Sequence, residues 1–166
     1  YSDNKTTNLD GKLNGSLAGD DIAPAKQVRL QGLEFNNSGT KMFLLFLGDG
    51  NDINGDTRKE RLLEYNLSTP YDLTNITLVE NAGINLTGSS FANPMGMRFS
   101  PDGKRFWTID HGTRGLTQIS LDVAFSTSSY TVDGQINILN LNGTNSFDEP
   151  RGIALSASGL KLYIGT

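Results

Sequence analysis

The chain has 166 residues, with 14 Lys and Arg against 18 Asp and Glu, one His and no Cys, for a formal net charge of −4. The missing cysteines exclude a disulfide framework, a thiolate metal site and a cysteine nucleophile. The longest apolar run, Met42 to Leu47, is far shorter than the roughly 20 residues that cross a bilayer, and the acidic excess argues against a nucleic-acid binder. Composition therefore predicts neither membrane insertion nor nucleic-acid binding.

Strands and turns dominate the predicted secondary structure. Asn, Gly, Ser and Thr are abundant and charged residues make up only 19% of the chain, which favours turns and strands over helices. No window carries the i, i+3, i+4, i+7 apolar spacing of an amphipathic helix. We therefore predict an all-β chain that is almost free of helix.

Residues 1–28 precede the first clear repeat unit. Within this segment, residues 7–20 resemble residues 84–89 and 139–144, which precede later copies of the repeat. We predict that residues 1–28 supply the outer strand of a unit whose inner strands lie elsewhere.

The main signal is a motif that recurs three times, from Gly32 to Phe43, from Gly96 to Trp107 and from Gly152 to Tyr163. In each copy the first Gly is followed by an apolar residue three positions on, a second Gly seven on, a cation nine on and an aromatic residue eleven on. Internal self-similarity of this kind is the sequence signature of a repeat architecture.

Each copy of the motif predicts a β-hairpin. A short strand leads into an Asn-Ser-Gly, Pro-Asp-Gly or Ala-Ser-Gly turn, and an aromatic-rich strand returns. Third strands are predicted at residues 63–67 and 117–121, and fourth strands at residues 76–80 and 135–141. Four antiparallel strands repeated head to tail are typical of a β-propeller blade. The predicted division is a first blade at residues 29–93, a second at residues 94–149, and the first two strands of a third at residues 150–166.

The pattern Gly-apolar-x-Phe-x-x-Asp-Gly-x-Lys-x-aromatic resembles the blades of YVTN-type and lactonase-like propellers. With the segment from Tyr65 to Leu73, the copy that begins at Gly96 is similar to repeats in secreted or phage-associated proteins of marine bacteria and their viruses. The resemblance covers residues 28–166. It implies a fold rather than an activity, because such propellers serve as enzymes, adhesins and scaffolds.

Two and a half blades are too few for a closed ring, since rings contain about four or more. Either the chain is a piece of a longer propeller or several copies complete a ring together. The first residue is Tyr rather than Met, which fits a fragment or a processed product. The predicted partners are further blades, in the same chain or in other chains, with a homo-oligomer as one arrangement.

An acidic loop of about ten extra residues is predicted between the second and third strands of the first blade. Its Asp49, Asn51, Asp52, Asn54 and Asp56 carry the hard oxygen ligands that Ca²⁺ prefers. The spacing departs from an EF-hand loop, because an Ile takes a ligand position and no Gly stands sixth. Two interpretations stay open, a Ca²⁺ site and a solvated acidic loop that holds no cofactor.

A second set of candidates lies on loops that a propeller would bring to one rim. Asp110, His111 and Arg114 follow the second strand of the second blade, and Glu149 and Arg151 precede the third hairpin. We predict that these five residues form a binding rim. A His beside an Asp can act as a general base or a metal ligand, but no Ser-His-Asp spacing is present, so no catalytic residue is assigned.

These observations favour a non-enzymatic propeller segment that serves binding or structural assembly outside the cell, at the cell surface or in a virion. The alternative is a metal-dependent hydrolase or a lactonase-like enzyme. Its metal would be held on the loop rim by Asp49, Asp52, Asp56 or Asp110 together with His111.

Overall fold

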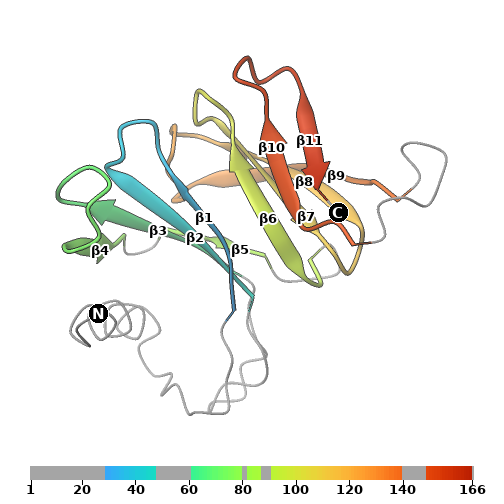
Figure 1. Ribbon diagram of the computed structural model, residues 1–166, viewed down its shortest axis with the longest axis horizontal. Coiled ribbons are helices and arrows are strands. Elements are labelled where there is room, and N and C mark those ends of the chain that lie inside the picture. The colour runs from blue at the N-terminus through green and yellow to red at the C-terminus, as the bar shows by residue number, and fades with distance from the viewer. Residues whose placement is uncertain (1–28, 48–60, 80–81, 87–90, 140–148, 166) are drawn as a thin grey trace, which may run out of the picture.

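The computed structural model describes residues 29–47, 61–79, 82–86, 91–139 and 149–165 (Figure 1). Within these ranges the chain is built of strands and contains no helix, and thus no helix long and apolar enough to cross a membrane. The predicted outer strand in residues 1–28 lies outside the described residues. The strands are β1 (Arg29–Phe35), β2 (Lys41–Leu47), β3 (Arg61–Leu67), β4 (Ile76–Leu78), β5 (Ile84–Asn85), β6 (Pro94–Phe99), β7 (Arg105–Asp110), β8 (Gly115–Leu121), β9 (Tyr130–Asn137), β10 (Gly152–Leu155) and β11 (Leu162–Gly165).

Three antiparallel sheets follow one another along the chain. Blade 1 has the order β1-β2-β3-β4, with the short β5 also paired to β3, and blade 2 has the order β6-β7-β8-β9. The third sheet is the hairpin β10-β11. The prediction of an all-β fold with four-stranded blades is therefore confirmed. The fourth strand of blade 2 was predicted at residues 135–141, which is wrong, because β9 spans Tyr130–Asn137 and pairs with the full length of β8.

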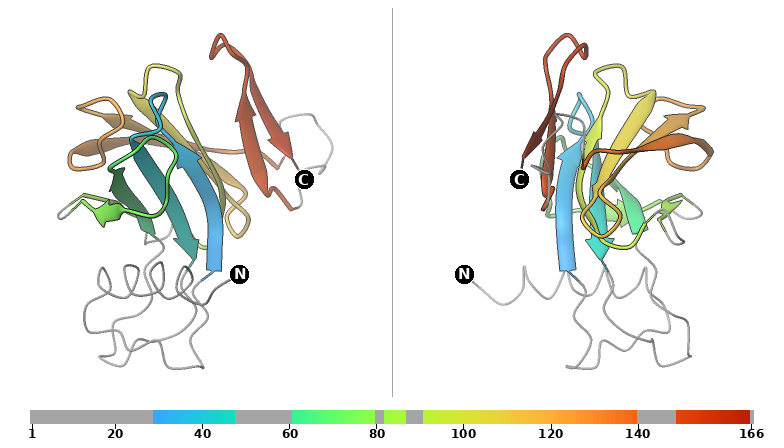
Figure 2. Two further views of the ribbon diagram at one scale, coloured as in Figure 1. Left: turned by 60° about the vertical axis from the view of Figure 1, so that its left-hand side comes forward. Right: turned by 90° about the vertical axis from the view of Figure 1, so that its right-hand side faces the viewer.

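The sheets pack through their inner strands. Strands β1 and β2 contact β6, and β6 and β7 in turn contact β10. Figure 1 shows β1, β6 and β10 in succession across the molecule, and Figure 2 shows the β10-β11 hairpin at one end of this row. Each inner strand therefore adjoins the inner strand of the next repeat.

The first Gly of the motif stands where successive inner strands approach each other most closely. A Cβ added at Gly32 would lie 3.2 Å from the Met97 side chain, and one added at Gly96 would lie 3.0 Å from the backbone of Arg151 and Gly152. Strands β1 and β6 also carry a β-bulge just before this Gly. The recurrence of Gly here thus reflects close packing between repeats.

The second Gly of the motif closes the hairpin turn in the same way three times. Gly39, Gly103 and Gly159 have φ between 69° and 70°, a left-handed conformation that favours glycine. In each copy, the backbone N–H of this glycine donates to the carbonyl of the residue three positions earlier. The side-chain oxygen of that earlier residue accepts the N–H that opens the returning strand, in the pairs Asn36–Lys41 (3.0 Å), Ser100–Arg105 (2.9 Å) and Ser156–Lys161 (3.1 Å).

An aromatic side chain covers this turn in both complete blades. The backbone N–H of Tyr71 donates to the Gly39 carbonyl (2.9 Å), and that of Phe125 donates to the Gly103 carbonyl (2.8 Å). Both aromatic residues have positive φ, and their rings lie where a Cβ on the glycine would sit. The connection from third to fourth strand is therefore locked onto the hairpin turn of its own blade.

The principal core lies between blade 1 and blade 2. Phe43 is fully buried, and its ring centroid lies 4.4 Å from that of Phe99, which also contacts Phe106 and Phe125. Three of the recurring aromatic residues, Phe43, Phe99 and Phe106, therefore pack blade 1 on blade 2. The cluster comprises Phe43, Leu45, Leu62, Ile84, Leu86, Phe91, Met97, Phe99, Phe106, Ile119 and Leu121.

A second cluster occupies the opposite face of blade 1 and comprises Met42, Leu44, Tyr65, Leu67 and Ile76. The Tyr65 side chain is completely buried in this cluster. Tyr71 is exposed, and Tyr130 is half-buried against the principal core.

Candidate functional site

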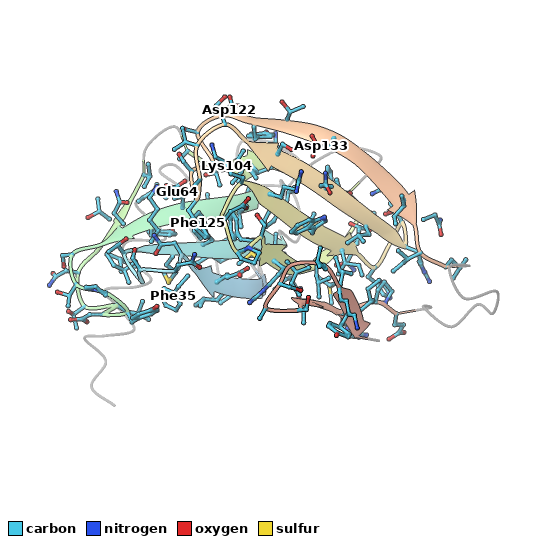
Figure 3. The ribbon with its side chains drawn as sticks, turned by 90° about the horizontal axis from the view of Figure 1, so that it is seen from above. Phe35, Glu64, Lys104, Asp122, Phe125 and Asp133 are labelled. Carbon is cyan, nitrogen blue, oxygen red and sulfur yellow. The ribbon has the colours of Figure 1, made fainter. Side chains whose placement is uncertain are left out.

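A buried carboxylate joins blade 1 to blade 2. Glu64 lies on β3 and is inaccessible to solvent. Its Oε1 lies 2.5 Å from Lys41 Nζ, and its Oε2 accepts hydrogen bonds from the backbone N–H (2.7 Å) and the hydroxyl (2.9 Å) of Thr127. Lys41 Nζ also donates to the Phe125 carbonyl (2.9 Å). Figure 3 labels Glu64 and Phe125 close to one another.

This arrangement, which we call the Glu64 clamp, satisfies the carboxylate with groups of both blades. A buried charge is costly unless it is paired and hydrogen-bonded, and here one cation and two donors surround it. Thr127 and Phe125 lie in the connection between β8 and β9, so the carboxylate recognises one particular loop of the following blade. The clamp therefore fixes which surface of blade 2 faces blade 1.

The equivalent positions on blade 2 carry different side chains. Trp107 and Gln118 form a cross-strand pair, as Phe43 and Glu64 do in blade 1, and Arg105 replaces Lys41. Trp107 Nε1 donates to Gln118 Oε1 (3.2 Å), and Gln118 Nε2 donates to Asp133 Oδ2 (2.8 Å). A neutral amide bonded within its own blade thus stands in place of the carboxylate that reaches the next blade.

Asp133 completes this surface. Its Oδ2 also accepts the Ser120 hydroxyl (2.7 Å), and the hydrogen bonds from Gln118 and Ser120 lower the pKa of its carboxyl, with a smaller effect of the Arg105 charge. Cross-strand neighbours point to the same side of a sheet, so Ile136, opposite Leu116, lies on this side too and is 53% exposed. We call Arg105, Trp107, Gln118, Ser120, Asp133 and Ile136 the receiving face of blade 2.

The solvent exposure of the aromatic residue at one repeat position increases along the chain. Phe43, beneath blade 2, is 0% exposed, Trp107 is half-buried, and Tyr163 on β11 is 54% exposed. The β10-β11 hairpin contacts β6 and β7 but has no contact of comparable extent with β8 or β9. Within the described residues, β6 and β7 are therefore partly covered by the third hairpin, and the part of the receiving face on β8 and β9 is open.

Two residues of the predicted binding rim form an ion pair. Glu149 Oε2 lies 2.7 Å from an Arg151 guanidinium nitrogen, and both side chains are exposed. The hydrogen bond and charge of Arg151 lower the pKa of the Glu149 carboxyl, and the charges of His111 and Arg114 add to the effect. The assembly of these residues into a binding rim stays a prediction.

Asp110, the fifth predicted rim residue, is buried and bonded within its own turn. Its Oδ2 accepts the Asn93 N–H (2.7 Å), and its Oδ1 accepts the N–H (2.7 Å) and hydroxyl (3.1 Å) of Thr113. The carboxylate therefore holds the β7-β8 turn and the approach to β6 together. His111 donates its backbone N–H to the Asn93 carbonyl (2.9 Å) in the same turn.

The acidic-loop candidates Asp49, Asn51, Asp52, Asn54 and Asp56 lie outside the described residues, so the Ca²⁺ interpretation stays a prediction. In the part of the chain that the structure describes, no three His, Cys, Asp or Glu side chains are grouped as a metal site would require. Sequence reasoning missed Glu64. The one signal for it was a carboxylate inside the apolar strand Arg61–Leu67, where burial demands a partner.

Comparisons with known proteins identify no family for this chain. No protein-family model matches the chain, and no curated protein matches it. Among solved structures, it is similar to a chain of the "Crystal structure of Nidogen/Laminin Complex", with a TM-score of 0.40 and 14% identity. The alignment covers 85% of this chain and 57% of that one, so the chain spans little more than half of the neighbour's length. At this similarity the likeness carries no functional argument.

Proposed function

We propose that this chain is a non-enzymatic propeller segment that serves binding and structural assembly, and that its receiving face packs against the outer strands of a further blade. The observation that carries the proposal is the graded exposure of Phe43, Trp107 and Tyr163, three residues at one repeat position. In the interface between blades 1 and 2, the aromatic residue at this position is covered by the next blade. The same cover is expected over Trp107.

The chemistry of the receiving face suits such a partner. It combines an aromatic ring and an exposed Ile with Arg105, Gln118 and Asp133, whose hydrogen-bonding groups can meet the backbone of a strand connection. A location outside the cell, at the cell surface or in a virion is part of the proposal and rests on composition alone.

Trp107 is the only Trp in the chain, so its fluorescence reports on the receiving face directly. The experiment compares acrylamide quenching of Trp107 in the 166-residue chain with quenching in the protein purified from its natural source, together with the intact mass of the latter. We expect weaker quenching and a blue-shifted emission in the natural protein. Equal quenching in both would overturn the proposal.

A separate experiment, the addition of Ca²⁺, tests the enzymatic alternative. A metal-dependent hydrolase with ligands in the acidic loop should show a rise in melting temperature with Ca²⁺ and a bound ion by native mass spectrometry. We expect neither, because the spacing of the loop carboxylates departs from that of an EF-hand loop. A Ca²⁺-dependent rise that is lost in Asp52→Asn would favour the alternative.

A further inference from the structure

A cavity of about 230 Å³ lies where the hairpin turns of the three repeats meet. It adjoins the ends of β1, β6 and β10, at the opposite end of these strands from the predicted rim. The residues that line the cavity come from all three repeats and include Glu34, Phe35, Arg98, Phe99 and Leu155. The volume is below the roughly 300 Å³ at which sites for drug-sized ligands begin, so the space suits a smaller molecule.

Two charged side chains of this cavity occupy the same repeat position. Glu34 stands two residues after Gly32, and Arg98 stands two residues after Gly96. Glu34 Oε1 lies 3.1 Å from an Arg98 guanidinium nitrogen, and Glu34 Oε2 accepts the Phe99 N–H (3.0 Å). The Glu34 side chain is 12% exposed, and that of Arg98 is 46% exposed. The carboxylate is thus enclosed while the guanidinium remains accessible.

The third repeat does not continue this series of charges. Its equivalent residue is Ala154, which offers no carboxylate to Arg98. A guanidinium presents five donors in a planar fork that matches a carboxylate. Phe35 and Leu155 give the cavity an apolar part, and Asn37, Ser100 and Ser156 give it a polar part.

We propose that this cavity binds a small monocarboxylate with an apolar body, whose carboxylate pairs with Arg98 while its body contacts Phe35 and Leu155. Such a site is separate from the receiving face and independent of the proposed function. The ligand and Glu34 compete for the same guanidinium, so binding depends on the ionisation of Glu34.

The direction of that dependence follows from the surroundings of Glu34. Burial raises the pKa of Glu34 to about 7, with the Arg98 charge and the Phe99 N–H acting in the opposite sense. Among nearby charged groups, Lys41 on β2 is engaged by Glu64, and Asp102 in the β6-β7 turn accepts bonds from Ser100 and the Lys104 N–H. A protonated Glu34 releases Arg98 to the ligand, whereas benzoate itself stays ionised well above pH 5. Affinity should therefore rise about tenfold from pH 8 to pH 6.

The test titrates the ¹⁵N-labelled 166-residue chain with sodium benzoate at pH 6 and pH 8 and follows the Phe99 amide resonance. We expect saturable shifts, with affinity about tenfold higher at pH 6. Arg98→Gln should weaken binding at least tenfold, while Arg61→Gln, which removes an arginine of β3 outside the cavity, should leave it unchanged. Glu34→Gln keeps Arg98 and should bind benzoate equally at both pH values, with the affinity that the unmodified chain has at pH 6.

Three results would overturn the proposal. One is unchanged benzoate affinity in Arg98→Gln. Another is an equal response to benzyl alcohol, which has the apolar body without the carboxylate. The third is a Glu34→Gln variant that keeps the pH dependence of the unmodified chain.

Discussion

At the scale of single residues, two glutamates of blade 1, Glu34 on β1 and Glu64 on β3, have opposite environments. Glu64 is surrounded by Lys41 and by two donors of Thr127, whereas Glu34 is enclosed with one half-exposed cation and one N–H. Both carboxylates cross from blade 1 to blade 2. Glu64 therefore contributes to the attachment of the blades when ionised, and Glu34 is an ionisable group whose charge is unfavourable at neutral pH.

Glu34 predicts a pH-dependent stability. Its pKa of about 7 in the folded chain exceeds the ordinary value of 4.5, so its contribution is fully present below pH 4.5 and is lost as pH rises through 7. The loss is at most about 3 kcal/mol. Glu34→Gln should remove this slope, as measured by urea unfolding between pH 5 and pH 8. Glu149→Gln is the matched control, since the lowered pKa of its exposed carboxyl acts only below this window. A slope unchanged in Glu34→Gln would contradict the prediction.

The Glu64 clamp predicts that substitutions at equivalent positions of the two blades lower the free energy of unfolding by unequal amounts. Glu64→Ala leaves the Lys41 ammonium and the Thr127 N–H without their buried partner and should lower the free energy of unfolding by about 3 kcal/mol. Gln118→Ala removes the equivalent residue of blade 2, which is half-buried, and should cost about 1 kcal/mol. Urea unfolding of both variants measures the difference, and equal costs would show that the clamp does not stabilise the blade interface.

At the scale of elements, the hairpin turn is the unit that recurs most faithfully. The φ of its glycine and the bonds around it agree in all three copies, while the aromatic cover is present over Gly39 and Gly103. The motif predicted these hairpins because all of its contacts lie within a few residues. It did not reveal the contacts of Tyr71 and Phe125, because each lies beyond the third strand, more than twenty residues after the glycine that it covers.

Alanine substitutions at two equivalent glycines distinguish the cost of backbone strain from the cost of steric conflict. Gly103→Ala places a methyl group into the Phe125 ring in addition to forcing positive φ, and should cost about 3 kcal/mol. Gly159→Ala has the same φ but only the Pro101 ring at 3.4 Å, so its cost should be about 1 kcal/mol. Thermal unfolding followed by circular dichroism compares the two, and similar shifts in melting temperature would mean that the aromatic cover is easily displaced.

At the scale of the whole molecule, the blades form a row with one covered interface and one half-covered interface. Exposed apolar side chains accompany the half-covered side, among them Ile136 on the receiving face and Tyr163 on β11. Exposed apolar surface beside strand edges favours association between chains. The 166-residue chain should therefore associate as its concentration rises.

A charged substitution on the receiving face tests whether the chains associate through it. Ile136→Asp should shift the chain toward monomer in multi-angle light scattering at micromolar concentrations, because it places a carboxylate on the surface that is buried on association. Val123→Asp is the matched control, an exposed apolar residue in the β8-β9 connection outside that face. A chain that is monomeric at every concentration, or an equal effect of both substitutions, would argue against association through this face.

The repeat, the hairpins and the all-β class could be predicted from the sequence, because these depend on local turn chemistry and on apolar residues at fixed spacing. The rim of Asp110, His111, Arg114, Glu149 and Arg151 was predicted because repeat units bring equivalent loops to one end, and it stays a prediction. The roles of Glu34 and Glu64 depend on how the blades pack and could not be predicted from the sequence. Each meets its partner in the next blade, more than sixty residues away along the chain, and such pairs are selected by how the sheets pack rather than by any pattern within one repeat.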